Sequence, residues 1–481
     1  MAPADPTTVT TTSGTVRGRR HEHGTVFLDV PYGAPPVGRG RFAAPTPHQR
    51  WTGIRDTTRP GPTAPQPARD SFGTLDMSPY FGPGWQRGDD YLTVNIWAPR
   101  PDGTPRPVMV FVHGGGFVAG SNRAPLYDGT AFARDGVVLI TVNYRLGIPG
   151  FLHLPDAPDN RGMLDVLAAL HWIRENAAGF GADPENLTLF GQSAGAVIVG
   201  GVLADPASTG LFRRAIIQSG SGTGAFTPNQ ARIVTAAVGR GLGLEPTAKA
   251  LADIPDEHLV AVTAGLTGLD LRTSTHHDPL GGITFFSLVS EQQPATAVAA
   301  GQGGEIDLLI GANRDEGALY LAPSGLLAST TDADVRDTAA KFHPDPDEAV
   351  RAYRTRHPAA SAADLRTAIL GDGLFTDGTR QMAAAHASAT TGRTYLYEFA
   401  WRSDAIDGQL GACHVMELPF VFDRLSLPSL RGQRGLLGNA EPPAPLATRM
   451  HHSWIRFAET GNPGWPVHEP TGPHVQHLGA A

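Results

Sequence analysis

A serine flanked by glycines lies where an apolar, strand-like run is followed by an apolar, helix-like stretch. The segment is Gly191-Gln192-Ser193-Ala194-Gly195, and the apolar run before it covers residues 187–190. At such a junction the chain turns sharply, and flanking glycines let it close without Cβ clashes, so the serine hydroxyl projects above the sheet edge. The N–H groups that open the helix face any anion formed there. These features predict Ser193 as a nucleophile, and the alternative is a glycine-rich turn with an incidental serine.

A second glycine-rich segment, His113-Gly114-Gly115-Gly116-Phe117, follows its own apolar run earlier in the chain. Acyl transfer produces a tetrahedral oxyanion, which needs preorganised N–H donors close to the nucleophile. Consecutive glycines let the backbone approach and turn its N–H groups inward. We therefore expect Gly115, Gly116 and Ala194 to form an oxyanion hole. The alternatives are a flexible loop or a phosphate-binding loop, but the Lys-Ser/Thr pair that a common phosphate loop requires is missing.

A serine nucleophile needs a histidine base, which is itself oriented by a carboxylate. When the serine stands on this kind of turn, the acid and then the histidine follow it along the chain. The strand-like run 306–310 leads into a loop that contains both Asp315 and Glu316. Both are placed to serve as the acid, and the pattern alone does not separate them.

Three late histidines are candidates for the base. His414 follows a strand-like run at residues 394–399 and a turn-rich segment. His451 and His452 lie on a predicted helix that ends near Glu459, which favours a surface or packing role. The pattern therefore favours His414. Its neighbour Cys413, the only cysteine of the chain, is predicted to be a small buried residue.

The elements that must position these residues alternate between strands and helices. Buried, non-alternating strands separated by helices indicate an α/β fold with a mostly parallel sheet. The first hundred residues contain antiparallel hairpin material, whereas residues 223–389 are predicted to be mainly helices inserted around the site. The predicted strands are 15–17, 26–30, 108–112, 137–142, 187–190, 215–218, 306–310 and 394–399, and a clear amphipathic helix is 163–176.

Composition narrows the function classes. The 481 residues contain 38 basic and 46 acidic side chains, a net charge of −8, which disfavours a dedicated nucleic-acid binder. One cysteine excludes an intrachain disulfide and a cysteine-based zinc cluster. The longest apolar runs are too short to span a bilayer, and the N-terminus shows no secretory signal pattern. We expect a cytoplasmic protein without metal, membrane or nucleic-acid partners, and a monomer by default.

The motifs together resemble those of the type-B carboxylesterase/cholinesterase family of α/β-hydrolases, in particular its bacterial carboxylesterases of the para-nitrobenzyl esterase type. The resemblance extends over nearly the whole chain, and its motifs occur in the family order. The matching segments are 14–18, 30–38, 41–42, 89–97, 113–117, 143–147, 180–184, 190–196, 218–221 and 417–420.

This resemblance implies a triad of Ser193, Glu316 and His414. It selects Glu316 over Asp315 because the glutamate before a glycine is the family position. It also implies one α/β-hydrolase domain over residues 1–481, with a large mixed, mostly parallel sheet flanked by helices. The inserted helices, roughly within 223–389, would cap an active-site gorge.

The chain departs from the family pattern at three positions. The family usually carries a disulfide between a cysteine near Ala64 and one at Tyr91, and both are missing here, so packing alone is expected to hold that loop. Gln192 stands where cholinesterases carry a glutamate, which disfavours a choline-type cation site.

Other side chains receive supporting roles. Phe117, Gln192 and Phe226 are expected to line the substrate pocket. Ser219 is placed beside the triad. The family pattern suggests an ion pair between Arg145 and Asp165, and a similar pair is expected between Arg41 and Asp89.

The predicted activity is hydrolysis of a small carboxylic ester by a serine carboxylesterase, through an acyl-enzyme and without a cofactor. One alternative is a non-catalytic binding protein on the same fold. Another is a lipase, carbamate hydrolase or amidase, because the triad does not select the leaving group.

Overall fold

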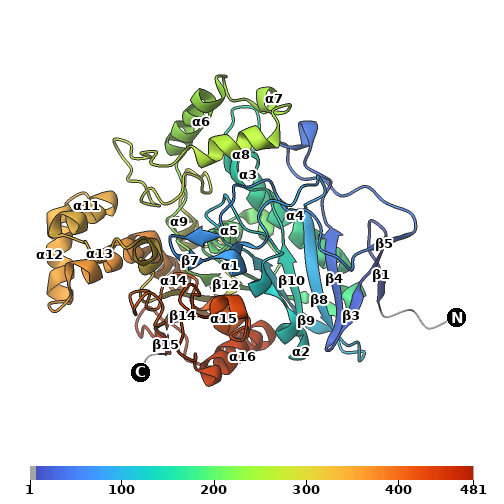
Figure 1. Ribbon diagram of the computed structural model, residues 1–481. Coiled ribbons are helices and arrows are strands. Elements are labelled where there is room, and N and C mark those ends of the chain that lie inside the picture. Colours follow the sequence, from blue (N-terminus) through green and yellow to red (C-terminus); the bar gives the residue numbers. More distant parts are fainter. Residues whose placement is uncertain (1–6, 390, 480–481) are drawn as a thin grey trace.

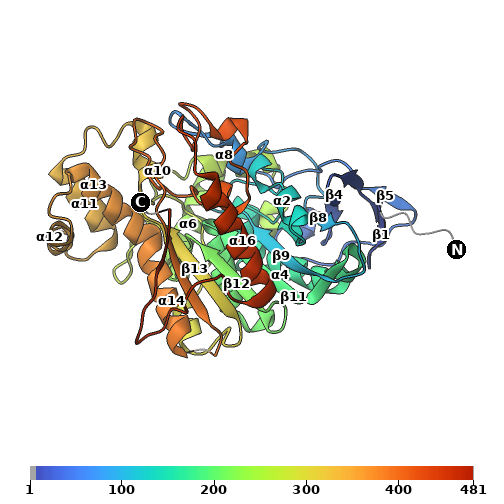
Figure 2. The same ribbon diagram turned by 90° about the horizontal axis from the view of Figure 1, so that it is seen from below.

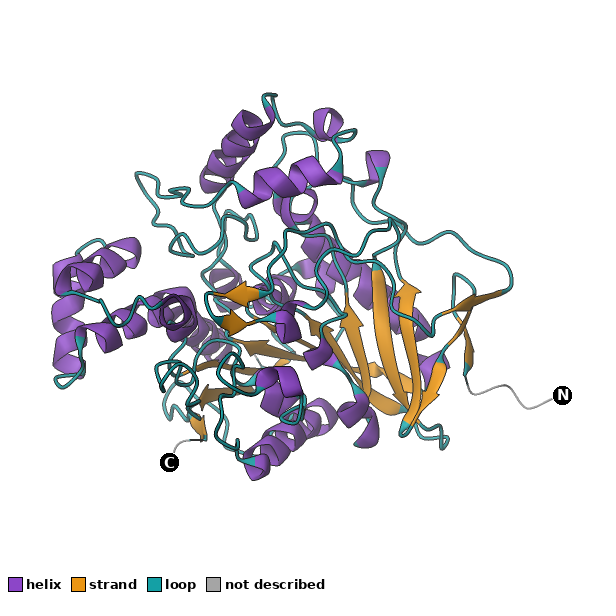
Figure 3. Cartoon of the chain, in the orientation of Figure 1, coloured by secondary structure: helices purple, strands orange, loops and turns teal. Residues whose placement is uncertain are grey.

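The structure is a computed structural model that describes residues 7–389 and 391–479. Its core is one twisted sheet of ten strands (Figures 1 and 3). The seven strands from β15 to β10 in the spatial order are parallel, while β8, β4 and β3 continue the sheet antiparallel. This confirms the predicted mixed, mostly parallel sheet. In spatial order the strands are β15 (Gln476–Leu478), β14 (Thr394–Phe399), β13 (Asp307–Asn313), β12 (Arg214–Gln218), β11 (Ala182–Gln192), β9 (Arg106–Val112), β10 (Val138–Val142), β8 (Thr93–Pro99), β4 (Gly24–Pro31) and β3 (Arg19–His21).

Helices cover both faces of this sheet. Successive side chains of a strand point to opposite faces, and β12 shows both layers. A Cβ on Gly200 of α5 would lie 3.8 Å from Ile217, whereas the next residue, Gln218, accepts a hydrogen bond from Trp454 of α16 at 3.1 Å. Figure 2 shows α16 lying across the strands of the sheet. The helices around the sheet are α1 (Ser78–Phe81), α2 (Thr130–Arg134), α3 (Gly147–Phe151), α4 (Arg161–Asn176), α5 (Ala194–Leu203), α9 (Pro294–Ala299), α10 (Ala318–Leu321), α14 (Asp377–Ala389), α15 (Leu418–Val421) and α16 (Ala444–Thr460).

Two further groups of helices lie away from the sheet. The first group, α6–α8, forms the upper part of Figure 1, and the second, α11–α13, projects at its left. The second group has a small core of its own around Val335, Tyr353 and Ile369. Its helices α11 and α13 begin with capping boxes, which satisfy backbone N–H groups that a helix start leaves unpaired. The helices are α6 (Pro228–Leu242), α7 (Ala248–Leu251), α8 (Asp256–Ala264), α11 (Asp332–Phe342), α12 (Pro346–Arg356) and α13 (Ala362–Gly371).

The N-terminal strands confirm the predicted antiparallel hairpins. Residues 15–17 and 26–30 lie in strands that pair antiparallel with the strand before each of them, and the two hairpins belong to different sheets. Strand β2 (Thr15–Arg17) pairs with β1 (Thr8–Thr10) and β5 (Ile54–Asp56), whereas β4 belongs to the main sheet. Two very short strands, β6 (Ser71–Phe72) and β7 (Leu75–Asp76), pair beside the site described below.

The predicted buried ion pair between Arg145 and Asp165 is confirmed, with a shortest distance of 2.7 Å and both side chains fully buried. The expected Arg41–Asp89 pair is wrong. Arg41 lies 3.4 Å from Asp256 and donates to the carbonyl of Ile254, so it contacts the inserted helix α8 and the segment before it.

Within residues 7–389 and 391–479, no helix has both the length and the apolar character needed to cross a lipid bilayer.

Candidate active site

The predicted site residues converge at one edge of the sheet. Ser193 directly follows β11, Glu316 follows β13, and His414 lies in the segment after β14. Because β11, β13 and β14 run parallel, their carboxyl ends meet at the same edge. Ligand sites of open α/β sheets form at this edge.

Ser193 occupies a strained turn between β11 and α5. Its backbone has φ 56° and ψ −127°, a conformation that costs energy for any residue with a side chain. The chain can turn here because its neighbours lack side chains: a Cβ on Gly195 would lie 2.1 Å from the carbonyl oxygen of Val112, and one on Gly191 would lie 2.7 Å from Gly195. The two glycines are therefore required for this geometry.

A continuous chain of hydrogen bonds joins the three candidate triad residues. The Oγ of Ser193 lies 2.8 Å from Nε2 of His414, and Nδ1 of His414 lies 2.6 Å from Oε2 of Glu316. Since an ionised carboxylate only accepts hydrogen bonds, Nδ1 carries the proton and Nε2 is free to accept one from the serine. His414 and Glu316 are almost completely buried.

Glu316 and Asp315 face different partners. The second oxygen of Glu316 accepts hydrogen bonds from the Asn313 N–H at 2.7 Å and from the Ser219 hydroxyl at 2.6 Å. Asp315 instead accepts from the backbone N–H of Ala412 and pairs with Arg402 on the surface. The structure thus brings Glu316 to the histidine and directs Asp315 away from it.

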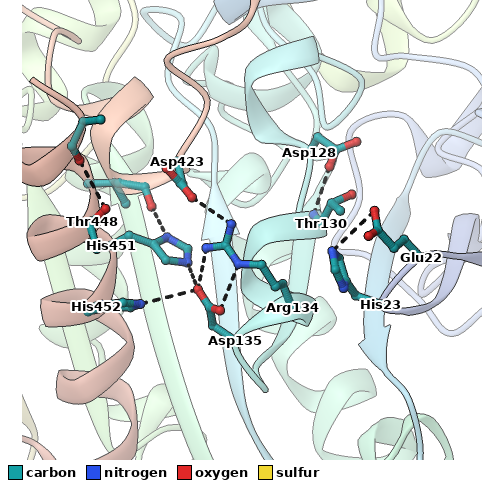
Figure 4. Close-up of polar contacts among 12 residues, drawn as sticks. Glu22, His23, Asp128, Thr130, Arg134, Asp135, Asp423, Thr448, His451 and His452 are labelled. Carbon is teal, nitrogen blue, oxygen red and sulfur yellow. Dashed lines mark hydrogen bonds and ion pairs between the residues drawn. The ribbon is translucent and has the colours of Figure 1, made fainter. Parts of the chain in front are cut away.

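The two alternative histidines lie elsewhere, on α16 (Figure 4). His451 is buried and donates from Nδ1 to the carbonyl of Val421 at 2.7 Å. Its Nε2 lies 3.1 Å from Asp135, and Nε2 of His452 lies 3.7 Å from the same carboxylate. Both histidines therefore contribute to the contact between α16 and the end of α2, which fits the packing role expected for them.

The glycine loop after β9 approaches Ser193 closely. A Cβ on Gly114 would lie 3.0 Å from the Cβ of Ser193. Gly115 and Gly116 have φ of 121° and 63°, which glycine adopts without cost. Among the described residues, the backbone N–H groups of Gly115, Gly116 and Ala194 donate to no protein acceptor. All three residues line the same pocket as Ser193, so their N–H groups are available to an anion there.

The pocket above Ser193 is lined mainly by apolar side chains. Of the three residues expected to line it, Phe117 and Gln192 do so, and the Gln192 amide lies 3.3 Å from Nε2 of His414. Phe226 does not. It is buried in the core, where its backbone is hydrogen-bonded to Leu288 and Ser290.

The chain is similar to known proteins over nearly its whole length. The model of the carboxylesterase family matches residues 5–474. The chain is 34% identical to the para-nitrobenzyl esterase of Bacillus subtilis (strain 168), over 96% of this chain and 93% of that protein. It is also 34% identical to the phenmedipham hydrolase of Pseudarthrobacter oxydans, over 98% and 94%. Among solved structures, a carboxylesterase of Geobacillus stearothermophilus superposes with a TM-score of 0.83 at 33% identity, covering 99% of this chain and 97% of that one.

The chain belongs to the carboxylesterase family. It is an ester hydrolase with the α/β-hydrolase fold, as the resemblance implied.

The loop that lacks the family disulfide is held by more than packing, which corrects the expectation. Ala64 and Tyr91 are both buried. Gln66, two residues after Ala64, accepts a hydrogen bond from the Gly120 N–H at 2.8 Å and donates to the Gly120 carbonyl at 3.0 Å. This two-point contact ties the loop to the segment that follows Gly114, Gly115 and Gly116.

Burial controls the titration of the groups behind the triad. Burial, together with the nearby charge of Glu316, raises the pKa of Glu417 to about 7, although a hydrogen bond from Asn313 opposes the shift. Burial also raises the pKa of the Cys413 thiol, so the cysteine stays protonated. The prediction that Cys413 is buried is confirmed.

Two pocket residues have no recognisable signal in the sequence. Phe375 lies in a short π-helical segment, Asp372–Thr376, and Arg69 lies in the loop before β6. Both line the pocket of Ser193. Their positions depend on how distant segments pack over the sheet edge, which a single sequence does not show.

Proposed function

We propose that this protein is a serine carboxylesterase that works through an acyl-enzyme, with Ser193 as nucleophile, His414 as general base and Glu316 as the acid that orients the base. The single observation that carries the proposal is the chain of hydrogen bonds at 2.8 and 2.6 Å that joins these residues.

In the first half-reaction Ser193 Oγ attacks the ester carbonyl while Nε2 of His414 takes its proton. Glu316 holds the imidazole by its Nδ1–H and stabilises the imidazolium that forms. The N–H groups of Gly115, Gly116 and Ala194 stabilise the oxyanion, a contribution that is large because the donors are already in place. Collapse of the intermediate breaks the bond to the alcohol oxygen, which leaves with the proton from His414.

In the second half-reaction water replaces the alcohol. His414 takes a proton from water, the resulting hydroxide adds to the acyl carbonyl, and the tetrahedral intermediate releases Ser193 with the proton returned to it. The product leaves as the carboxylic acid and ionises by releasing a proton to water, and the enzyme is regenerated. The proposed reaction needs no cofactor.

The test is hydrolysis of a 4-nitrophenyl ester by the Ser193→Ala variant. We expect turnover to fall by roughly four orders of magnitude or more, because the covalent route is lost. A fluorophosphonate probe should label the unaltered protein and leave Ser193→Ala unlabelled. Ser208→Ala, at a buried serine outside the pocket, is the matched control and should retain both properties. Near-normal turnover or labelling of Ser193→Ala would overturn the proposal.

A further inference from the structure

A permanently charged side chain, Arg69, lines the otherwise apolar pocket of Ser193. Its guanidinium lies over the rings of Phe72 and Phe81, at 5.0 and 5.5 Å from their centroids. Among the described residues that line this pocket, no other side chain carries a permanent charge. An arginine in such surroundings needs a specific reason, because removing a charge from water is costly unless a partner compensates.

No carboxylate supplies that compensation in the part of the chain that the structure describes, where Arg69 forms no ion pair. The adjacent Asp70 is exposed and accepts a hydrogen bond from Ser71 instead. The hydrogen bond of Arg69 is one from Nη1 to the carbonyl of Gly115 at 3.5 Å, the limit of such a bond. By contrast, the buried Arg145 is fully paired with Asp165.

The remaining donors of Arg69 have no hydrogen-bond partner among the described residues. Its Nε and Nη2 are not fully buried, since neither is among the buried polar atoms that lack a hydrogen-bond partner. A guanidinium offers five N–H groups in a planar fork, which matches the two oxygens of a carboxylate. Burial lowers the pKa of Arg69, so the group is partly desolvated. A guanidinium nevertheless stays charged in proteins.

The guanidinium lies beside the proposed oxyanion hole. Nη1 contacts Gly115 and lies 3.2 Å from where a Cβ on Gly116 would be. These are the two glycines whose N–H groups are proposed to bind the carbonyl oxygen of the ester. An anion held by Arg69 would therefore be only a few atoms from the scissile carbonyl of the same substrate.

We propose that Arg69 is a specificity-determining residue that binds a free carboxylate carried by the ester substrate. The inference rests on the proposed function of Ser193 and names the substrate class: esters that bear a second, anionic group near the scissile bond, such as half-esters of dicarboxylic acids or hydroxybenzoates acylated on the phenol oxygen.

The test compares esters that differ in one charge. On the acyl side the pair is mono-4-nitrophenyl adipate and 4-nitrophenyl hexanoate, and on the alcohol side it is 3-acetoxybenzoate and 3-tolyl acetate. For Arg69→Met we expect the ratio of kcat/KM for the anionic ester to that for the neutral ester to fall about tenfold or more in at least one pair. Arg69→Lys keeps the charge but loses the fork, and should recover part of the ratio.

The matched control is Arg87→Met. Arg87 also lies over an aromatic ring, that of Trp85 at 4.3 Å, but it is exposed and outside the pocket. Its ratio should equal that of the unaltered enzyme. An equal loss on anionic and neutral esters in Arg69→Met, or no loss on either, would overturn the proposal, because Arg69 would then serve the fold or the oxyanion alone.

Binding separates this inference from the proposed nucleophile. In the Ser193→Ala background, 3-acetoxybenzoate should bind by calorimetry, and adding Arg69→Met should raise its Kd about tenfold or more while leaving that of 3-tolyl acetate near its original value. This readout holds whether or not Ser193 proves to be the nucleophile. An unchanged Kd for the anion would overturn the role of Arg69.

Discussion

The ring of Phe375 stacks on the imidazole of His414, with centroids 4.1 Å apart and planes inclined by 15°. Phe375 reaches this position from the π-helical segment Asp372–Thr376, between α13 and α14. Single π-helical turns inside helices are frequent at functional sites. The histidine is therefore fixed in two directions: Glu316 binds its edge and Phe375 covers its face.

The stacking predicts that Phe375 affects kcat by orienting His414, although Phe375 itself transfers no proton. Phe375→Leu removes the aromatic face but keeps an apolar side chain, so the imidazole loses orientation while the pocket stays dry. We expect kcat to fall roughly three- to tenfold, in line with the energy of an aromatic pair. Steady-state kinetics on a 4-nitrophenyl ester would measure it. Phe212→Leu, buried outside the pocket, is the control, and an unchanged kcat in Phe375→Leu would contradict the prediction.

The two neighbouring acids should behave in opposite ways. Glu316→Gln keeps the size of the side chain but loses the charge that selects the tautomer of His414, and we expect kcat to fall about 10⁴-fold. Asp315→Asn should leave kcat within a few-fold, since Asp315 contacts Arg402 and Ala412 instead. Its cost should appear in the free energy of unfolding, at about 1–2 kcal/mol. A large loss of kcat only in Asp315→Asn would reverse the assignment.

The proposed oxyanion hole can be tested by comparing two glycines that both have positive φ, Gly115 at 121° and Gly103 at 87°. A Cβ on Gly115 would lie 1.9 Å from the carbonyl oxygen of Ala119, whereas one on Gly103 would have nothing within 4 Å, and both have positive φ. Gly115→Ala must therefore displace the loop, and we expect kcat to fall about 10²- to 10³-fold. Gly103→Ala should cost stability alone, about 1 kcal/mol. Equal kcat values in the two variants would argue against the proposed oxyanion hole.

The strands and turns that carry the candidate site residues could be predicted from the sequence, because each is defined by residues close together in the chain. Strand β14 begins and ends where the apolar run 394–399 predicts. Strand β11 starts at Ala182, earlier than the predicted run 187–190. The sequence does not indicate this start, because residues 183–186 are mostly polar and the register with β9 shifts before Leu187. Polar residues that pair irregularly leave no apolar signal.

Contacts between residues that are far apart in the chain could not be predicted from the sequence. Arg41 pairs with Asp256 of an inserted helix, and nothing in the spacing of the chain indicates which helix would cover it. Phe226 was expected in the pocket but packs into the core beside Leu288. Arg69 and Phe375 reach the pocket only through the packing of a loop and a π-helical turn. The proposed catalytic groups can thus be recognised from local motifs, whereas the residues around them in the pocket depend on the tertiary structure.

The buried carboxyl of Glu417 should make stability depend on pH. Its pKa is raised to about 7, first by burial and then by the charge of Glu316, while it accepts hydrogen bonds from Asn313 at 2.7 Å and Gln218 at 3.1 Å. Between its unfolded pKa of about 4.3 and its folded pKa, the folded state binds more protons than the unfolded state.

The contribution of Glu417 to the free energy of unfolding is therefore fully present below this window and is lost as the pH rises through about 7. Glu417→Gln mimics the protonated form, so its free energy of unfolding in urea should depend less on pH than that of the unaltered protein. The stability of the variant relative to the unaltered protein should therefore be greater at pH 8 than at pH 5. Glu175→Gln, at an exposed glutamate on α4, should keep the original dependence. If Glu417→Gln lost stability with rising pH as steeply as the unaltered protein, the carboxyl would titrate normally, and burial would not be what holds its proton.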